Sequence, residues 1–272
     1  MYTFGSICWC FFNLFLCNLR SDVASALDAS NKNADWGGKW FPNLPNSVSD
    51  TNPLVEFTPS NDDVHMGVVS KYCDDAQTNL TIDWDNSPIN YTCFESKYLY
   101  FPRDIQPIGI SYSIPQEYLA PHKCMDTPIH YTTRIPTFGT HRPLWAKYGE
   151  YMFLPIQRWL HNVEHGAIVL LYHPCANVQE LTLLKNIVKK CLFRHIITPY
   201  ILLTMDYPFA LVAWGHSLEM SIVDPSLAIS FIKEHALRGP ETKFDDGQYD
   251  YKLMEHAEVI SNEEDSHLCP NM

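Results

Sequence analysis

Three side chains capable of acid–base and metal-binding chemistry occur within five residues, in the segment His161-Asn-Val-Glu164-His165. Zinc peptidases of the inverted type use this H-x-x-E-H order: the two histidines bind the metal, and the glutamate is the general base for the bound water. On a helix, residues three and four apart share a face, so His161, Glu164 and His165 would lie together. The segment is therefore a candidate site for zinc or copper.

A short amphipathic helix is expected to carry this segment, because proline stands at its start and glycine just past its end, at positions 155 and 166. Between them, apolar residues recur at helical spacing: Ile156, Trp159, Leu160 and Val163. At about 100° per residue, the centre of this apolar stripe lies almost opposite the histidines and the glutamate. We therefore expect the polar cluster to face away from the main sheet, toward solvent or a covering segment.

Two interpretations of the cluster stay open. In the first, His141 completes a metal site with His161, Glu164 and His165, and His216 is a more distant candidate ligand. In the second, His161 and Glu164 hydrogen-bond the backbone of the loop that carries His141 and hold it over the helix. Peptidase chemistry is disfavoured, because the helix ends directly after the motif and no third protein ligand is evident. The chain also lacks a G-x-S-x-G motif, a phosphate loop and a Rossmann glycine pattern, so no catalytic residue is assigned and binding is favoured over catalysis.

The elements around the motif predict an α+β fold. After the helix that begins at residue 155 come an apolar strand at 167–173, an amphipathic helix at 178–192, strands at 200–205 and 209–215 joined by a turn, and a helix that Asp224 caps. A right-handed crossover makes the first two strands parallel, and the short turn makes the third antiparallel. The expected core is helix-strand-helix-strand-strand-helix, a small mixed sheet with packed helices.

The composition divides the chain into four parts. Residues 1–26 resemble a signal peptide, with an apolar run at 7–16 and small residues at Ala24 and Ala26. Residues 27–123 form a loop-rich region, 124–242 the α+β domain, and 243–272 an acidic tail, expected to be a solvated extension tethered only if Cys269 is bridged. No stretch after residue 26 approaches the ~20 apolar residues of a membrane span.

The cysteines predict disulfides and an oxidising compartment. Three of the nine lie in the signal segment, which leaves an even number of six: Cys73, Cys93, Cys124, Cys175, Cys191 and Cys269. Cys175 and Cys191 would stand roughly 20 Å apart along the intervening helix, beyond the ~7 Å limit for a bridge, so each needs another partner. The remaining connectivities stay open.

Two sequons, at Asn79 and Asn90, agree with the secretory route and predict a secreted or lumenal glycoprotein. The formal net charge is -12, and lysine and arginine do not cluster. Nucleic acid is therefore excluded as a partner, and an unidentified protein partner is expected instead.

The run "IPTFGTHRPLWAKYGEYMFLPIQRWLHNVEHGAIVLLYHP", residues 135–174, resembles the signature of domain of unknown function 3105. The resemblance extends over residues 124–242 and includes "LVAWG" and "FIKEHALRGPE" farther along. Phe138 stands where the family usually has serine, and Thr140 where bacterial members often have proline. The resemblance implies no established catalytic activity. For the animal branch, whose members bear a signal and are often membrane-anchored, it implies an association with damage-induced growth suppression.

Overall fold

The computed structural model describes residues 64–94, 100–241, 243, 245–270 and 272. All of them belong to the second of two units into which the chain divides, residues 58–272. The predicted signal peptide, with Cys8, Cys10 and Cys17, lies outside the described residues.

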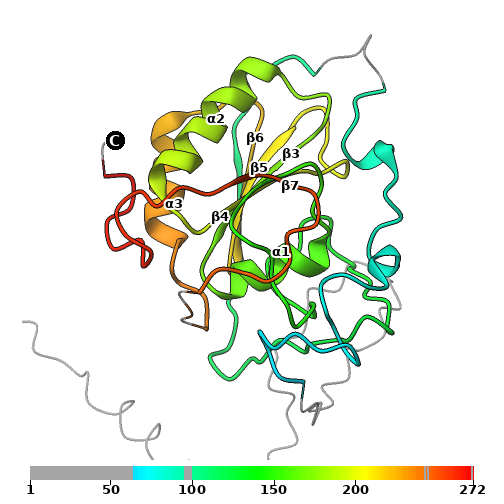
Figure 1. Ribbon diagram of the computed structural model, residues 1–272. Coiled ribbons are helices and arrows are strands. Elements are labelled where there is room, and N and C mark those ends of the chain that lie inside the picture. The colour runs from blue at the N-terminus through cyan, green and yellow to red at the C-terminus, as the bar shows by residue number, and fades with distance from the viewer. Residues whose placement is uncertain (1–63, 95–99, 242, 244, 271) are drawn as a thin grey trace, which may run out of the picture. The chain divides into compact units, whose positions relative to one another are not determined.

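A seven-stranded mixed sheet runs through the structure in the order β1-β6-β5-β3-β4-β2-β7 (Figure 1). Its strands are β1 (Ile108–Ser111), β2 (Gly149–Tyr151), β3 (Ile168–Tyr172), β4 (His195–Pro199), β5 (Phe209–Ala213), β6 (His216–Met220) and β7 (Leu253–His256). The central strand β3 pairs in parallel with β4 on one side and antiparallel with β5 on the other. The sheet thus has the predicted mixed character.

Three α-helices cover the two faces of the sheet: α1 (Ile156–Glu164), α2 (Val178–Cys191) and α3 (Pro225–His235). Alternate residues of β3 point to opposite faces, as the period of a strand requires. Ile168 and Leu170 join the core beneath α2 and α3, whereas Val169 and Leu171 join the core that contains α1 (Figure 1). The predicted α+β class is confirmed, and among the described residues no helix has the length and apolar character needed to cross a membrane.

The prediction of a strand at 200–205 is wrong. The second strand of the parallel pair is β4 at His195–Pro199, and the chain then enters a turn in which Leu202 and Met205 are exposed. The expected hairpin is wrong as well, because β5 pairs with β3 and not with β4. The apolar residues at 200–205 led to the strand prediction, although only some of them are buried.

Besides β4, four strands were not expected. β1 is mostly exposed, β2 has three residues, and β6 follows β5 after a two-residue turn, so none gives a clear periodic signal. The fourth, β7, lies within the acidic tail and pairs antiparallel with β2. The tail is therefore not a free solvated extension, because β7 completes one edge of the sheet.

Three disulfides join the six predicted cysteines: Cys73–Cys124, Cys93–Cys175 and Cys191–Cys269. The prediction of disulfide bonding is confirmed, as is the exclusion of a bridge between Cys175 and Cys191. The first two bridges attach the loop-rich segment before residue 124 to the structure, and the third holds the tail to the end of α2. Such bonds persist in oxidising compartments, such as the secretory pathway.

Candidate metal centre

Helix α1 carries the polar cluster on the side opposite its apolar stripe. Trp159, Leu160 and Val163 enter the core with β3. The helix ends at Glu164, and Gly166 follows with φ +81°, where a Cβ atom would meet Leu237 Cα at 2.7 Å. This close approach requires glycine. Gly166 therefore allows the sharp turn from α1 into β3 directly after the motif.

Covering segments bury the cluster, so that His161, Glu164 and His165 are each at most 3% exposed. Two short stretches run side by side over the helix, where His122 and His141 form an isolated parallel bridge. Their backbones are joined by hydrogen bonds from Lys123 N to His141 O and from His141 N to Pro121 O, at 3.0 and 3.1 Å. Of the two expected environments, solvent or a covering segment, the structure has the second, and the covering stretches bring His122 and His141 to the helix.

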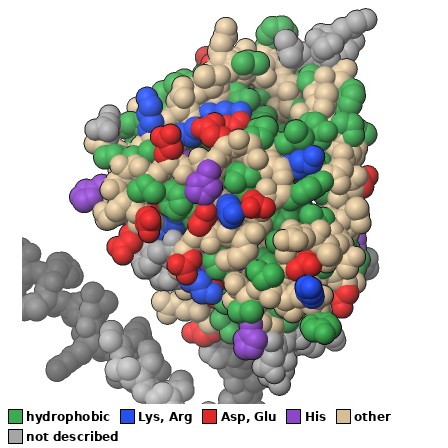
Figure 2. Space-filling view, viewed as in Figure 1, with side chains coloured by type: hydrophobic (Ala, Val, Ile, Leu, Met, Phe, Trp, Pro, Cys, Tyr) green, Lys and Arg blue, Asp and Glu red, His purple; other side chains and the backbone are tan. Residues whose placement is uncertain are grey.

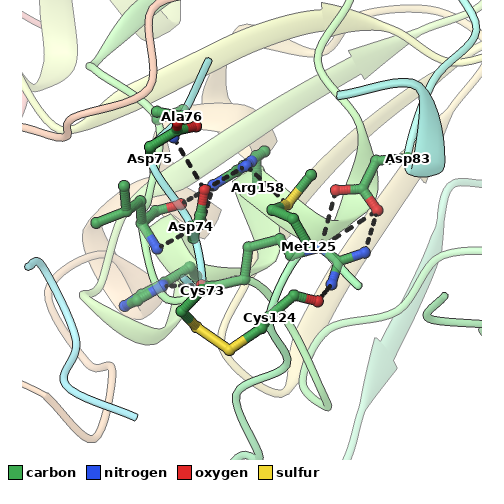
Figure 3. A network of polar contacts seen from close by, with 12 residues as sticks. Cys73, Asp74, Asp75, Ala76, Asp83, Cys124, Met125 and Arg158 are labelled. Atoms are coloured by element: carbon green, nitrogen blue, oxygen red, sulfur yellow. Dashed lines mark hydrogen bonds and ion pairs between the residues drawn. A yellow bond between two sulfur atoms is a disulfide. The ribbon is translucent and has the colours of Figure 1, made fainter. Parts of the chain in front are cut away.

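Buried arginines fix these covering stretches to the disulfide-bonded loop. Arg142 Nε donates to Asp83 at 2.9 Å, and its Nη1 donates to the backbone oxygens of the stretch after His122. Arg158 on α1 pairs with Asp74, which follows Cys73 of the first disulfide (Figure 3). Breaking a buried ion pair leaves a charge without compensation, so these contacts hold the covering stretches against α1.

Four ligand atoms converge beneath this cover, from His122, His141, His161 and Glu164, and all lie within 4.8 Å of one another. We call this group the inner site. His141 Nε2 lies 2.9 Å from both His122 Nε2 and Glu164 Oε2, and the latter two atoms are 3.9 Å apart. In a tetrahedral zinc site with bonds of about 2.0 Å, neighbouring ligand atoms are about 3.3 Å apart. The observed spacings of 2.9 and 3.9 Å lie on either side of that value.

Backbone contacts determine which ring nitrogens carry lone pairs. His141 Nδ1 lies 2.8 Å from Gly139 O and His161 Nδ1 2.6 Å from Arg142 O. A carbonyl oxygen only accepts, so each Nδ1 must carry the proton, and in the neutral rings each Nε2 presents its lone pair to the cluster. Such backbone acceptors orient metal-binding histidines in many proteins.

The inner site has too few protons for its acceptors. His161 Nε2 is buried and has no hydrogen-bond partner, and the buried Glu164 Oε2 faces His141 Nε2 at 2.9 Å while the His141 Nδ1–H donates to Gly139 O. Burial, followed by the neighbouring histidines, lowers the pKa of His161 well below its usual range. Burial and then His141 lower the pKa of His122 to about 3. Protonating these two rings is therefore unfavourable, and a metal cation would satisfy the converging lone pairs without it.

His165 and His216 lie outside the inner site. His165 Nε2 contacts Glu241 Oε2 at 3.2 Å, and these two residues with His161 form a second convergence of ligand atoms, which we call the outer group. His216 lies on β6, where its ring stacks on His235 at 4.0 Å and its Nδ1 contacts Ser111 Oγ. The structure thus brings His141, His161 and Glu164 together in the inner site. His165 lies beside them in the outer group, and His216 is elsewhere.

His122 was missed by the sequence reasoning. It stands outside any motif, and its only local signal is the neighbouring Cys124. The two sequons fall in the disulfide-bonded loop: Asn79 is exposed, whereas the Asn90 side-chain oxygen accepts a hydrogen bond from Trp84 Nε1 at 3.1 Å.

Residues 122–247 match the family model described as "Protein of unknown function (DUF3105)". The chain is also similar to tumor protein p53-inducible protein 13 of Rattus norvegicus, with 33% identity over 66 residues. That match covers 24% of this chain and 17% of the rat protein. No solved structure matches the chain significantly. The resemblance predicted from the sequence is confirmed: residues 122–247 match the DUF3105 family model, and the chain has a partial match to one curated relative.

Proposed function

We propose that this chain is a disulfide-bonded domain that binds one divalent transition-metal ion, zinc being the best fit, at the inner site. The observation that carries the proposal is the buried convergence of three imidazole nitrogens and one carboxylate oxygen, in which His161 Nε2 has no hydrogen-bond partner and Glu164 Oε2 faces the His141 Nε2 lone pair. Imidazole and carboxylate ligands at near-tetrahedral spacing suit zinc, and copper is the natural comparison because imidazole binds it as well.

A structural or storage role suits this site better than hydrolysis. Catalytic zinc sites keep one coordination position open for water, whereas structural sites are closed by four protein ligands. The inner site offers four protein ligands, and their side chains are at most 13% exposed. Glu164, the general base in a peptidase, lies here among the ligand atoms, and His165 turns to Glu241. The H-x-x-E-H motif therefore has a different geometry from the one peptidase chemistry needs.

The compartment forms part of the proposal. The three disulfides, the sequons and the predicted signal support a secreted or lumenal glycoprotein. Acidic and basic side chains are interspersed on the face shown in Figure 2, which suits a protein partner rather than nucleic acid.

Zinc titration of the chelator-stripped, disulfide-intact chain tests the metal proposal by calorimetry. We expect saturation at one ion per chain, loss of binding in His141→Ala, and unchanged binding in His216→Ala, whose histidine lies outside the cluster. Equal behaviour of the two variants, or no heat of binding in the parent chain, would contradict the proposal.

A growth-suppressing role is a second candidate. Its support is the partial match to the rat protein, whose name describes it as p53-inducible. Depleting this chain from damaged cells of its own organism should raise their growth rate, and re-expression should restore it. Unchanged growth in both arms would count against this role.

A further inference from the structure

The outer group lies beside the inner site and shares one residue with it. His161 belongs to both, while His165 and Glu241 belong to the outer group alone. The His161 and His165 rings are 4.7 Å apart between centroids, and Trp145 packs against both, at 5.0 and 4.4 Å. The four inner-site side chains, His165 and Glu241 therefore form one continuous polar path.

Exposure gives this path a direction. Glu241 has a side-chain exposure of 27%, the largest of the six, whereas the His165 side chain is fully buried. A cation arriving from solvent would therefore meet a carboxylate first, then His165 and His161. His165 Nε2 and Glu241 Oε2 are 3.2 Å apart, close to the roughly 3.3 Å spacing that two ligands of one zinc ion require.

The backbone holds Glu241 in this position. Leu237 N donates to Gly166 O at 2.8 Å, and Glu241 N donates to Glu164 O at 3.3 Å. Gly239 approaches so closely that a Cβ atom would stand 1.9 Å from Glu164 O. The segment after α3 is thus fastened to the end of α1 and carries Glu241 over the motif.

Lys243 makes the outer group a poor final site. Its Nζ lies 3.8 Å from Glu241 Oε2 and within cation–π distance of the Trp145 ring. A resident dication there would face this positive charge directly beside one of its ligand atoms, whereas the described ion pairs of the inner site join Glu164 to His122 and His141. An ion in the outer group would be held less firmly than one in the inner site.

We propose that Glu241 and His165 form an entry site, through which a metal ion reaches the inner site while His161 remains bound to it throughout. This inference rests on the proposed function. Because the ion exchanges its outer ligands for inner ones one at a time, it never has to cross the buried region without ligands. The H-x-x-E-H motif then has two tasks: His161 and Glu164 hold the ion, and His165 passes it on.

Stopped-flow measurements of zinc uptake and release, with a chromophoric chelator as reporter, test the entry site. We expect Glu241→Gln to slow both rates by about tenfold or more, because the attraction that gathers cations is lost. The dissociation constant should change little, since a group used only in transit affects both directions equally. Lys243→Gln should speed uptake. Glu234→Gln, which removes an exposed carboxylate on α3, is the matched control and should leave both rates unchanged.

Two outcomes would overturn the entry site while leaving the proposed function intact. One is zinc uptake at the parental rate in Glu241→Gln; the other is a weaker affinity with an unchanged uptake rate, which would make Glu241 a final ligand. If the parent chain takes up no zinc, the proposed function fails and the entry site fails with it. Should Glu241→Gln not fold, as judged by circular dichroism, Lys243→Gln decides: unchanged uptake in that variant also overturns the inference.

Discussion

Replacing Glu164 by glutamine should have opposite effects with and without metal. The Glu164 side chain is 4% exposed, and its Oε2 lies 2.9 Å from His141 Nε2, where two acceptors face each other. In chelator, Glu164→Gln removes a buried anion and offers an amide N–H to that nitrogen. We expect the stripped variant to be as stable as the stripped parent, or up to about 1 kcal/mol more stable.

With zinc the order should reverse. At a zinc concentration of 100 times the dissociation constant, binding stabilises the native state by about 2.7 kcal/mol. For a unit of this size, 1 kcal/mol corresponds to about 2–4 °C in Tm, so the parent should gain about 5–10 °C. The variant lacks the only anionic ligand of the inner site and should gain far less at the same zinc concentration.

Thermal melts in excess chelator and in excess zinc provide the assay. His216→Ala is the control and should follow the parent in both conditions. If protonated His141 simply donated to Glu164, Glu164→Gln would lower Tm by the same amount in chelator and in zinc. That result would refute the metal-based reasoning.

Three further predictions follow from the described contacts. Asp74→Asn leaves the guanidinium of Arg158 buried without its counter-charge, and denaturant titration should show that the free energy of unfolding falls by about 3–5 kcal/mol. Asp75→Asn is the control: Asp75 makes only local hydrogen bonds, and its replacement should lower the free energy of unfolding by less than about 1 kcal/mol. Burial lowers the pKa of His195 to about 4, so between pH 6.5 and 4 the unfolded chain binds this proton and the folded chain does not. The free energy of unfolding should therefore fall by about 3 kcal/mol as the pH drops through this range. Denaturant unfolding in chelator should show a smaller fall for His195→Gln. Asn79 is exposed, and Asn79→Gln should remove an endoglycosidase-sensitive mass from chain expressed through a eukaryotic secretory pathway; an unchanged mass would refute modification at that position.

The helices were predictable because their signals are local. Gly166 at the end of α1 and Asp224 at the start of α3 stand where the structure has helix boundaries, and the Asp224 side chain accepts from the backbone N–H of Ser226 and Leu227. Strand placement failed where burial decided it. Residues 200–205 are apolar enough for a strand, but the ladder ends at Pro199 and the exposed Leu202 lies in a turn. Apolar content alone does not show which residues find a neighbouring strand.

The candidate site was predictable only in part. The spacing of His161 and Glu164 placed both on one face of a helix, which the structure bears out. His122 and Glu241 reach the cluster through tertiary contacts. His122 precedes His161 by 39 residues in the chain, and Glu241 follows Glu164 by 77 residues. The cover over α1 depends on the Arg142–Asp83 pair and on the Cys73–Cys124 bridge, which sequence patterns do not reveal.

Elemental analysis of the chain, purified through the secretory route without added metal, tests the central claim most directly. We predict one zinc ion per chain after dialysis in metal-free buffer, retained in His216→Ala and lost in a His141→Ala/His161→Ala double variant that still folds in chelator. A parent protein without stoichiometric zinc or copper, whose Tm also stays the same when zinc or chelator is added, would contradict the account.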